Sequence, residues 1–187
     1  MEVRPQLILA SASPRRELLL REMGLRFRVV LPDGVEEILT GAAPDVLATQ
    51  NAQLKARAVA GRHPGALVIG ADTIVVLDGV VFGKPRDLAE AGAMLEKLTG
   101  REHEVITAVC MVHRTEFSFT ETSRVRMRQL SREQIAEYLK KINPLDKAGA
   151  YAAQEFGEMI IERVEGSFTN VMGLPIERLR AVLASMD

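Results

Sequence analysis

Short apolar runs alternate along this chain with stretches whose apolar residues recur at helical spacing. Runs at Leu7–Ala10, Phe27–Leu31 and Ala66–Gly70 predict strands, because brief apolar runs between turn signals are typical of buried strands. Between the last two runs, Pro44–Ala60 has near-helical spacing and ends at Gly61. The first part of the chain therefore combines strands with helices.

The helix predicted over Pro44–Ala60 has an apolar face that carries Leu47, Leu54 and Ala58. Residues three, four or seven positions apart lie on the same side of a helix, so this face is expected to pack on the core. Lys55 lies next to it and is expected near the edge of the buried surface.

A β-hairpin is the strongest local prediction. Asp78-Gly79 stands between Ile74–Leu77 and Val80–Phe82, and Asp-Gly between two such runs favours a two-residue turn. Because the arms have about equal length, Lys84 after the hairpin is expected to return beside Asp72, which precedes it. The hairpin thus places an acidic and a basic side chain on one rim.

The second half of the chain continues the same alternation. Capping boxes are expected at Asp87 and Ser131. In a capping box, two side chains three positions apart accept hydrogen bonds from free backbone N–H groups at the start of a helix. The predicted elements are helices 87–99 and 131–141, strands 104–112, 117–127 and 159–164, and a final helix from Pro175. Between them, Asn143–Gln154 has no clear period, and loops of that character often carry function. This mixture predicts an α/β or α+β protein built on a mixed sheet.

Size and charge narrow the class of protein. A chain of 187 residues fits one domain, or one domain with a lobe. A net charge of −1 argues against broad binding to nucleic acid or to a membrane surface. The sequence has no apolar run of about 18 residues and no basic segment followed by an apolar core at its start, so a cytoplasmic protein is expected. The single cysteine, Cys110, excludes an intrachain disulfide.

The motif Ser11-Ala12-Ser13-Pro14-Arg15-Arg16 lies between the first strand and a helix that ends at Gly24. Ser13 suits the N-cap, because its side-chain oxygen can accept a hydrogen bond from a backbone N–H, and Pro14 suits the first helical position. Such a helix start, with two hydroxyls and two guanidiniums, favours an anion such as phosphate. The alternative is a well-capped surface helix with two solvated arginines.

Cationic and acidic segments accompany this motif at the ends of predicted elements. The cationic segments are Arg15-Arg16, Lys55 and Lys84, and the acidic ones are Glu36-Glu37 and Asp72. Together they are typical of a polyphosphate site with a divalent ion, because carboxylates, phosphates and waters are the ligands that Mg²⁺ prefers. The simpler alternatives make Asp72 a turn residue and Glu36-Glu37 an exposed loop pair. The sequence has no Walker-type Gly-Lys-Ser/Thr loop and no Gly-x-Ser-x-Gly elbow.

Taken together, these motifs resemble the Maf family of nucleoside triphosphate pyrophosphatases, also called septum-formation inhibitor proteins. The resemblance extends over nearly the whole chain. The matching motifs, in order, are Ser11–Arg16, Gly70–Thr73, Gly83–Pro85, Asp146–Tyr151 and Gly173–Pro175. The resemblance implies a single domain over residues 1–187, with an elongated mixed β-sheet flanked by helices. It also implies two lobes with a central cleft, and a fold related to inosine-triphosphate pyrophosphatase.

The resemblance also implies an activity, the cleavage of a nucleoside triphosphate to the monophosphate and diphosphate with a divalent cation, Mg²⁺ or Mn²⁺. By motif position, Asp72 looks like the general base and a metal ligand, and Glu37 looks like a second metal ligand. The residues that look like phosphate or catalytic contacts are Ser11, Arg16, Lys55 and Lys84. A homodimer is implied as well.

Arg15, Thr73 and Gln154 match the positions that separate the substrate branches of this family. The branch that acts on 7-methyl-GTP typically has tryptophan and glutamine at the first two of these positions. With Lys147–Tyr151, Gln154 resembles the branch that acts on dTTP and UTP, and Thr73 and Gln154 together suit one edge of a pyrimidine. Hydrolysis of dTTP and UTP, or of modified pyrimidine triphosphates, is therefore expected. The alternatives are a purine or 7-methyl-GTP pyrophosphatase, and a nucleotide-binding regulator of cell division with little turnover.

Overall fold

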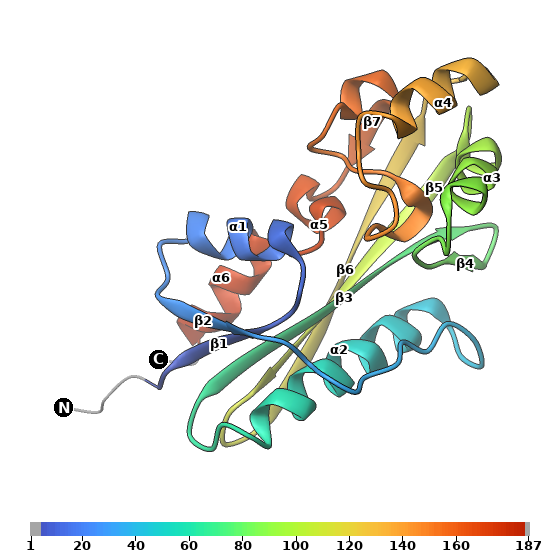
Figure 1. The fold of residues 1–187 in the computed structure, drawn as a ribbon. Coiled ribbons are helices and arrows are strands. Elements are labelled where there is room, and N and C mark those ends of the chain that lie inside the picture. Colours follow the sequence, from blue (N-terminus) through green and yellow to red (C-terminus); the bar gives the residue numbers. More distant parts are fainter. Residues whose placement is uncertain (1–4, 186–187) are drawn as a thin grey trace.

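The computed structural model describes residues 5–185 and is organised around a seven-stranded mixed sheet (Figure 1). The strands lie in the order β2-β1-β3-β5-β6-β7, and β4 pairs with β3 outside this path. The strands are β1 (Leu7–Ala10), β2 (Phe27–Val30), β3 (Leu67–Leu77), β4 (Val80–Phe82), β5 (Glu102–Val112), β6 (Glu116–Met127) and β7 (Ile161–Glu165). The helices are α1 (Pro14–Glu22), α2 (Pro44–Ala60), α3 (Leu88–Leu98), α4 (Arg132–Leu139), α5 (Phe168–Met172) and α6 (Ile176–Ser185), with 3₁₀ turns η1 (Ala148–Ala150) and η2 (Gly157–Met159).

Strand directions confirm the mixed sheet and the predicted hairpin. β1 runs parallel to both β2 and β3, whereas the other pairs are antiparallel. In the hairpin, Val75 pairs with Phe82 and Leu77 with Val80, so Asp78-Gly79 forms the two-residue turn. Both turn residues have positive φ, 51° and 77°, as this kind of turn requires.

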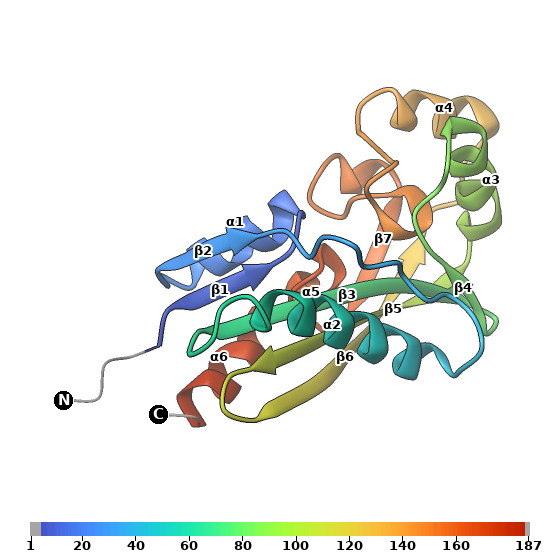
Figure 2. The ribbon, with the colours of Figure 1, turned by 60° about the horizontal axis from the view of Figure 1, so that its bottom comes forward.

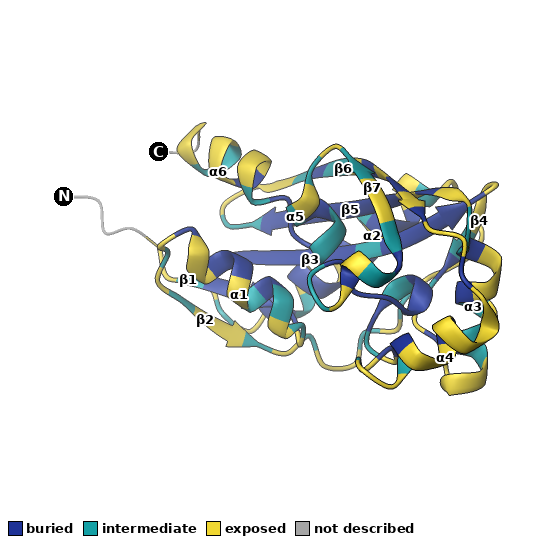
Figure 3. Cartoon of the chain, turned by 90° about the horizontal axis from the view of Figure 1, so that it is seen from above, coloured by how far each residue is buried: buried dark blue, intermediate teal, exposed yellow. Residues whose placement is uncertain are grey.

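The helices cover the sheet in three groups (Figures 1 and 2). α2 packs on one face, α1 and α6 pack on the other face beside β1, and α3 and α4 lie near the far ends of the long strands. Side chains alternate between the faces along β3. Ile74 therefore joins the cluster under α2, Ile69 the cluster under α1 and α6, and Val75 the cluster under α3 and α4. Figure 3 shows the buried strands beneath these helices.

Helix α2 packs on the sheet with a face made largely of small residues. Its buried residues are Leu47, Ala48, Asn51, Ala52, Lys55, Ala56 and Val59. The prediction was wrong for Leu54, which is 37% exposed, and for Ala58, which is outside this face. The reason is close packing at Gly70 of β3, where a Cβ would lie 2.6 Å from the carbonyl oxygen of Ala52. Such an approach is compatible with alanines and leaves no room for leucine.

Two other local predictions were wrong. β3 runs without a break from Leu67 to Leu77, although the sequence predicted separate strands on either side of Ala71-Asp72-Thr73. Ser13 is the N-cap of α1, but its side chain makes no capping hydrogen bond. Its backbone N–H instead donates to Ser11 Oγ, at 3.1 Å. The short helix α5 was not predicted, and β7 begins two residues after the expected start at Met159.

The capping residues of α3 and α4 were predicted correctly. Asp87 accepts a hydrogen bond from the backbone N–H of Glu90 at 2.8 Å, and Ser131 and Gln134 form the complete capping box. At α3 the return bond goes elsewhere, because the Glu90 carboxylate accepts from the backbone N–H of Arg86. The organisation as one domain with two lobes stays a prediction. No helix within residues 5–185 has the length and apolar character that a membrane span requires.

Candidate active site

One edge of β3 is open between two partner strands. β1 pairs with Leu67–Gly70 and β4 pairs with Val75–Leu77, so within the described chain no strand pairs with residues 71–74 along this edge. Asp72 and Thr73 lie at this gap, and their side chains point to opposite faces of the sheet. In open α/β sheets, ligands commonly bind outside the carboxyl ends of parallel strands, and β1 ends at this gap, with Ala10 paired to Gly70.

The gap leads into a cavity of about 370 Å³. The chain segments around it come from the β1–α1 turn, the β2–α2 loop, α2, β3, the hairpin, the 143–154 segment and the end of α5. The sequence-predicted site residues that line it are Ser11, Arg15, Arg16, Glu37, Lys55, Asp72, Thr73, Lys84 and Gln154. All of the predicted site residues therefore meet in one cavity.

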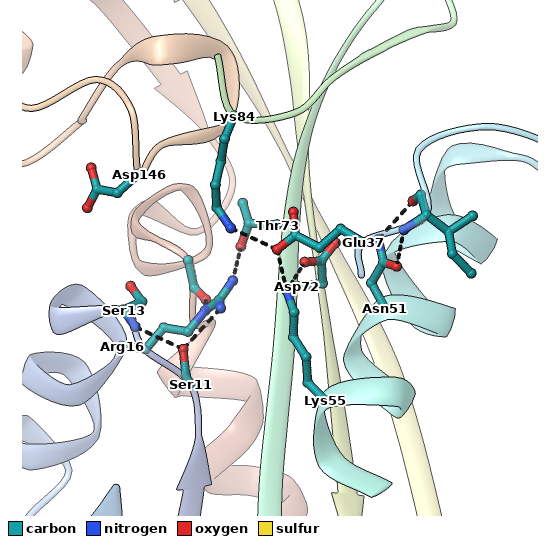
Figure 4. Close-up of polar contacts among 12 residues, drawn as sticks. Ser11, Ser13, Arg16, Glu37, Asn51, Lys55, Asp72, Thr73, Lys84 and Asp146 are labelled. Atoms are coloured by element: carbon teal, nitrogen blue, oxygen red, sulfur yellow. Dashed lines mark hydrogen bonds and ion pairs between the residues drawn. The ribbon is translucent and has the colours of Figure 1, made fainter. Parts of the chain in front are cut away.

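On the α2 side of the sheet, one ammonium group bridges two carboxylates (Figure 4). Lys55 Nζ lies 2.5 Å from Asp72 Oδ1 and 2.7 Å from Glu37 Oε1. Lys84 Nζ lies 2.7 Å from the same Glu37 oxygen. Lys84 therefore joins this cluster by its ion pair with Glu37. It also lines the same cavity as Asp72.

These contacts keep Glu37 ionised. Its partial burial acts to raise the pKa, but the charge of Lys55 and the hydrogen bonds from Lys55 and Lys84 outweigh burial and lower the pKa to about 2. Asp72 is almost fully buried, at 3% exposed, and is paired with Lys55. Buried charges of this kind are stable only when they are paired and hydrogen-bonded.

Sequence reasoning missed Asn51, which completes this cluster (Figure 4). The side chain is fully buried on α2. Its Nδ2 donates to Asp72 Oδ2 at 3.1 Å and to the carbonyl oxygen of Ile38 at 2.9 Å, while its Oδ1 accepts from the Ile38 N–H at 2.7 Å. The available signal was the spacing of Asn51 and Lys55, since residues four positions apart share a helix face.

On the opposite face of β3, Arg16 is held by three segments of the chain (Figure 4). Its guanidinium donates to the carbonyl oxygen of Gly173 at 2.8 Å, to Ser11 Oγ at 3.3 Å and to Thr73 Oγ1 at 3.0 Å. Burial lowers the pKa of Arg16, and the charge of Asp72 opposes that shift. A guanidinium fixed in this way presents a preorganised positive charge to the cavity.

The far rim of the cavity carries a second charged group. Arg15 Nη1 lies 3.1 Å from Asp146 Oδ2, and the buried Lys147 Nζ lies 2.8 Å from Asp146 Oδ1. Gln154 donates from Nε2 to Glu155 Oε1 at 3.0 Å. Its Oε1 is buried and has no hydrogen-bond partner within residues 5–185, so it is an acceptor that an N–H group of a ligand could satisfy.

The carboxylates of Glu37 and Asp72 fit a cation, because both converge on the ammonium group of Lys55. Residues 5–185 contain no group of three or more His, Cys, Asp or Glu side chains that could hold a metal. A divalent ion at Glu37 and Asp72 would therefore take its other ligands from substrate phosphates and water, the arrangement that Mg²⁺ commonly adopts.

Comparison with known proteins gives a family match over nearly the whole chain. The family model for Maf-like proteins matches residues 6–186. A protein of Symbiobacterium thermophilum, named dTTP/UTP pyrophosphatase, is 49% identical over 92% of this chain and 90% of its own length. A relative from Aquifex aeolicus with the same name is 42% identical over 97% of this chain and 96% of its own.

The fold also has a counterpart among solved structures. The Ham1 protein of Staphylococcus aureus superposes with a TM-score of 0.55 and 18% identity, over 97% of this chain and 100% of that one. At that identity the likeness concerns the fold alone, and it agrees with the expected mixed β-sheet flanked by helices. The family match and the relatives together cover nearly the entire sequence, and the chain belongs to the Maf family.

Proposed function

We propose that this chain is a nucleoside triphosphate pyrophosphatase that hydrolyses dTTP and UTP to the monophosphate and diphosphate. The observation that carries the proposal is the convergence of Arg16, Lys55 and Lys84 with the carboxylates of Glu37 and Asp72 in one cavity. Relatives at 42–49% identity bear the name dTTP/UTP pyrophosphatase, which supports the same activity here.

The cationic groups of the cavity are the proposed binding groups for the triphosphate. Arg16 is buried and held on one face of β3, whereas Lys84 is about half exposed at the cavity mouth. Ser11 adds a hydroxyl next to Arg16. These groups would hold the non-bridging oxygens of a triphosphate and stabilise the negative charge that grows on the departing diphosphate.

Asp72 is the proposed general base. A water molecule attacks the α-phosphorus, Asp72 accepts its proton, and the bond from the α-phosphorus to the bridging oxygen breaks as diphosphate leaves. From the described residues, each Asp72 oxygen accepts one hydrogen bond, from Lys55 or from Asn51, so lone pairs are left for the incoming proton. A Mg²⁺ or Mn²⁺ ion held by Glu37 and Asp72 would supply charge neutralisation and a lower pKa for the attacking water.

Selection of the nucleobase is assigned to the part of the cavity that Arg15, Asp146 and Gln154 line. Within residues 5–185 the buried Gln154 Oε1 has no hydrogen-bond partner, and such an acceptor suits the N–H group that thymine and uracil both present on their pairing edge. Arg15 lines the same cavity and is held there by Asp146. A site that hydrogen-bonds a base edge can reject analogues by factors of about 10⁴, because its own groups are left unpaired by the wrong base.

Other properties that the family resemblance implies stay predictions for this chain. They are a homodimer, a cytoplasmic location, and action without nucleic acid or membrane. The charge balance of the sequence, −1 overall, is the physical reason to expect no broad electrostatic attraction to either polyanion.

A product-resolved screen tests the proposal. Each of dTTP, UTP, dGTP and 7-methyl-GTP is incubated with the protein and Mg²⁺ or Mn²⁺, and the products are separated. The proposal expects dTMP or UMP in equal amounts with diphosphate, and little release of inorganic phosphate. A preference for either purine would overturn the substrate assignment, and nucleotide binding without diphosphate release would favour a regulator.

A further inference from the structure

The side chain of Asn51 joins two segments that carry the proposed catalytic carboxylates. On one side its Nδ2 contacts Asp72 Oδ2, and on the other side the amide pairs with both backbone polar groups of Ile38. Ile38 directly follows Glu37 in the chain. A single buried amide thus links the strand that bears one carboxylate to the loop that bears the other.

The position of this amide follows from the packing of α2. Gly70 lies two residues before Asp72 on β3, and the absence of a side chain there allows the backbone of α2 to approach at Ala52 and Ala56. Asn51 precedes Ala52, and Lys55 lies one turn further along the helix. The close contact of helix and strand therefore brings both polar side chains within hydrogen-bonding distance of the Asp72 carboxylate.

The loop on the other side of the amide has no regular structure of its own. Residues 31–43 connect β2 to α2, contain neither strand nor helix, and carry Glu37 near their middle. The backbone of Ile38 pairs with the Asn51 amide rather than with a neighbouring strand: its N–H donates to Asn51 Oδ1, and its carbonyl oxygen accepts from Asn51 Nδ2. Such a loop needs side-chain contacts to hold one conformation, because conformational entropy opposes its ordering.

We propose that Asn51 is a positioning residue that fixes Glu37 and Asp72 at the separation needed to share a divalent cation. The inference rests on the proposed function for its catalytic consequence. Lys55 bridges the same carboxylates by charge, but a divalent cation competes with that ammonium. Asn51 acts on Asp72 and on the backbone beside Glu37, so its contacts persist when a cation occupies the space between the carboxylates.

Two substitutions of Asn51 remove different sets of its hydrogen bonds. Asn51→Leu has similar size and removes all three hydrogen bonds. Asn51→Asp keeps the shape and the acceptor for the Ile38 N–H, but it loses both Nδ2 donors and places a like charge beside Asp72. Ser123→Ala is the control, because Ser123 is also buried and hydrogen-bonded, to Ser167 and Asn170, and is outside the cavity.

The first readout is hydrogen–deuterium exchange in the absence of nucleotide and metal. In Asn51→Leu, amides of residues 35–41 should exchange at least about 10-fold faster, since hydrogen bonds that order the loop are lost. In Asn51→Asp the increase should be smaller. Ser123→Ala should leave this segment at the wild-type rate.

The second readout is dTTP hydrolysis as a function of Mn²⁺ concentration. Both Asn51 variants should need at least about 10-fold more Mn²⁺ for the half-maximal rate. Their kcat should fall by a larger factor than their KM for dTTP rises, because the Arg16 contacts are unaltered. Folded variants with wild-type exchange in residues 35–41 and a wild-type Mn²⁺ requirement would overturn the inference. If the wild-type protein hydrolyses no nucleotide, the proposed function fails, whereas the exchange experiment still decides whether Asn51 orders the loop.

Discussion

Arg16 Nη2 donates a hydrogen bond of 3.0 Å to Thr73 Oγ1, which joins the first turn of α1 to the middle of β3. The hydroxyl of Thr73 also lies 2.9 Å from Thr107 Oγ1. Thr107 donates its own proton to the carbonyl oxygen of Asn170, so the proton between the two threonines belongs to Thr73. Thr73 therefore accepts from Arg16 and donates to Thr107, and its hydroxyl holds the arginine in place.

Replacing Thr73 by valine tests whether this residue acts through Arg16. Valine has nearly the same shape but cannot accept the hydrogen bond, which for a charged donor contributes about 1.5–3 kcal/mol. Thr73→Val should lower kcat/KM about 10- to 100-fold by similar factors for dTTP, UTP and dGTP, and Thr73→Ser should retain most activity. A change in the ratio between bases, without the uniform loss, would show instead that Thr73 contacts the base.

Replacing Gly70 by alanine should disturb the contact between α2 and β3. A Cβ at this position would lie 2.6 Å from the Ala52 carbonyl oxygen and 2.7 Å from the Ala56 backbone nitrogen. Because backbone must move, Gly70→Ala should lower the free energy of unfolding by about 1–3 kcal/mol and reduce dTTP turnover through displaced Lys55. Thermal melting and initial rates measure both effects.

Gly92 provides the matched control for that experiment. It lies inside α3, where the nearest atom to an added Cβ is Leu139 Cδ1, at 4.0 Å. Gly92→Ala should raise the free energy of unfolding by about 1 kcal/mol, since glycine is a poor helix former, and should leave turnover unchanged. Equal effects of the two substitutions on stability would contradict the proposed close packing at Gly70.

The burial of His103 predicts how the free energy of unfolding depends on pH. The side chain is 3% exposed, Nε2 lies 2.7 Å from the Tyr151 hydroxyl, and Nδ1 has no partner in residues 5–185. Burial lowers its pKa from 6.5 to about 4. Between these values the unfolded state binds more protons, so this contribution to stability is fully present above pH 6.5 and is lost as the pH falls towards 4.

Urea unfolding at pH 7.5 and pH 5 measures this dependence. The free energy of unfolding should fall by about 2 kcal/mol over that interval because of His103 alone. His103→Gln should be less stable at pH 7.5 and should lack most of that decrease. An identical decrease in the variant would assign the pH dependence to other groups.

The elements around the site were largely predictable because their signals are local. The turn at Asp78-Gly79 and the caps at Asp87 and Ser131 depend on neighbouring residues, and all three are confirmed. The break expected at Ala71-Asp72-Thr73 was wrong, because β5 pairs with this segment along its whole length. Such pairing with a distant strand can hold small and polar residues in extended conformation despite weak local preference.

The site residues were predictable by type but not by contact. The motifs indicated that Arg16, Lys55 and Asp72 belong together, and they line one cavity. The link from Thr73 to Arg16 and the role of Asn51 depend on which face of β3 each side chain occupies, and on how closely α2 approaches Gly70. Neither quantity follows from spacing along the chain.

Asp72 is proposed to accept a proton from the attacking water in a cavity that binds a nucleoside triphosphate. The most direct measurement is the rate of dTMP and diphosphate formation from dTTP with saturating Mn²⁺, for the wild-type protein and for Asp72→Asn. Asp72→Asn should stay folded and should lose at least about 100-fold in kcat, the usual effect of removing a general base. A folded Asp72→Asn variant with wild-type turnover would show that Asp72 is not the general base.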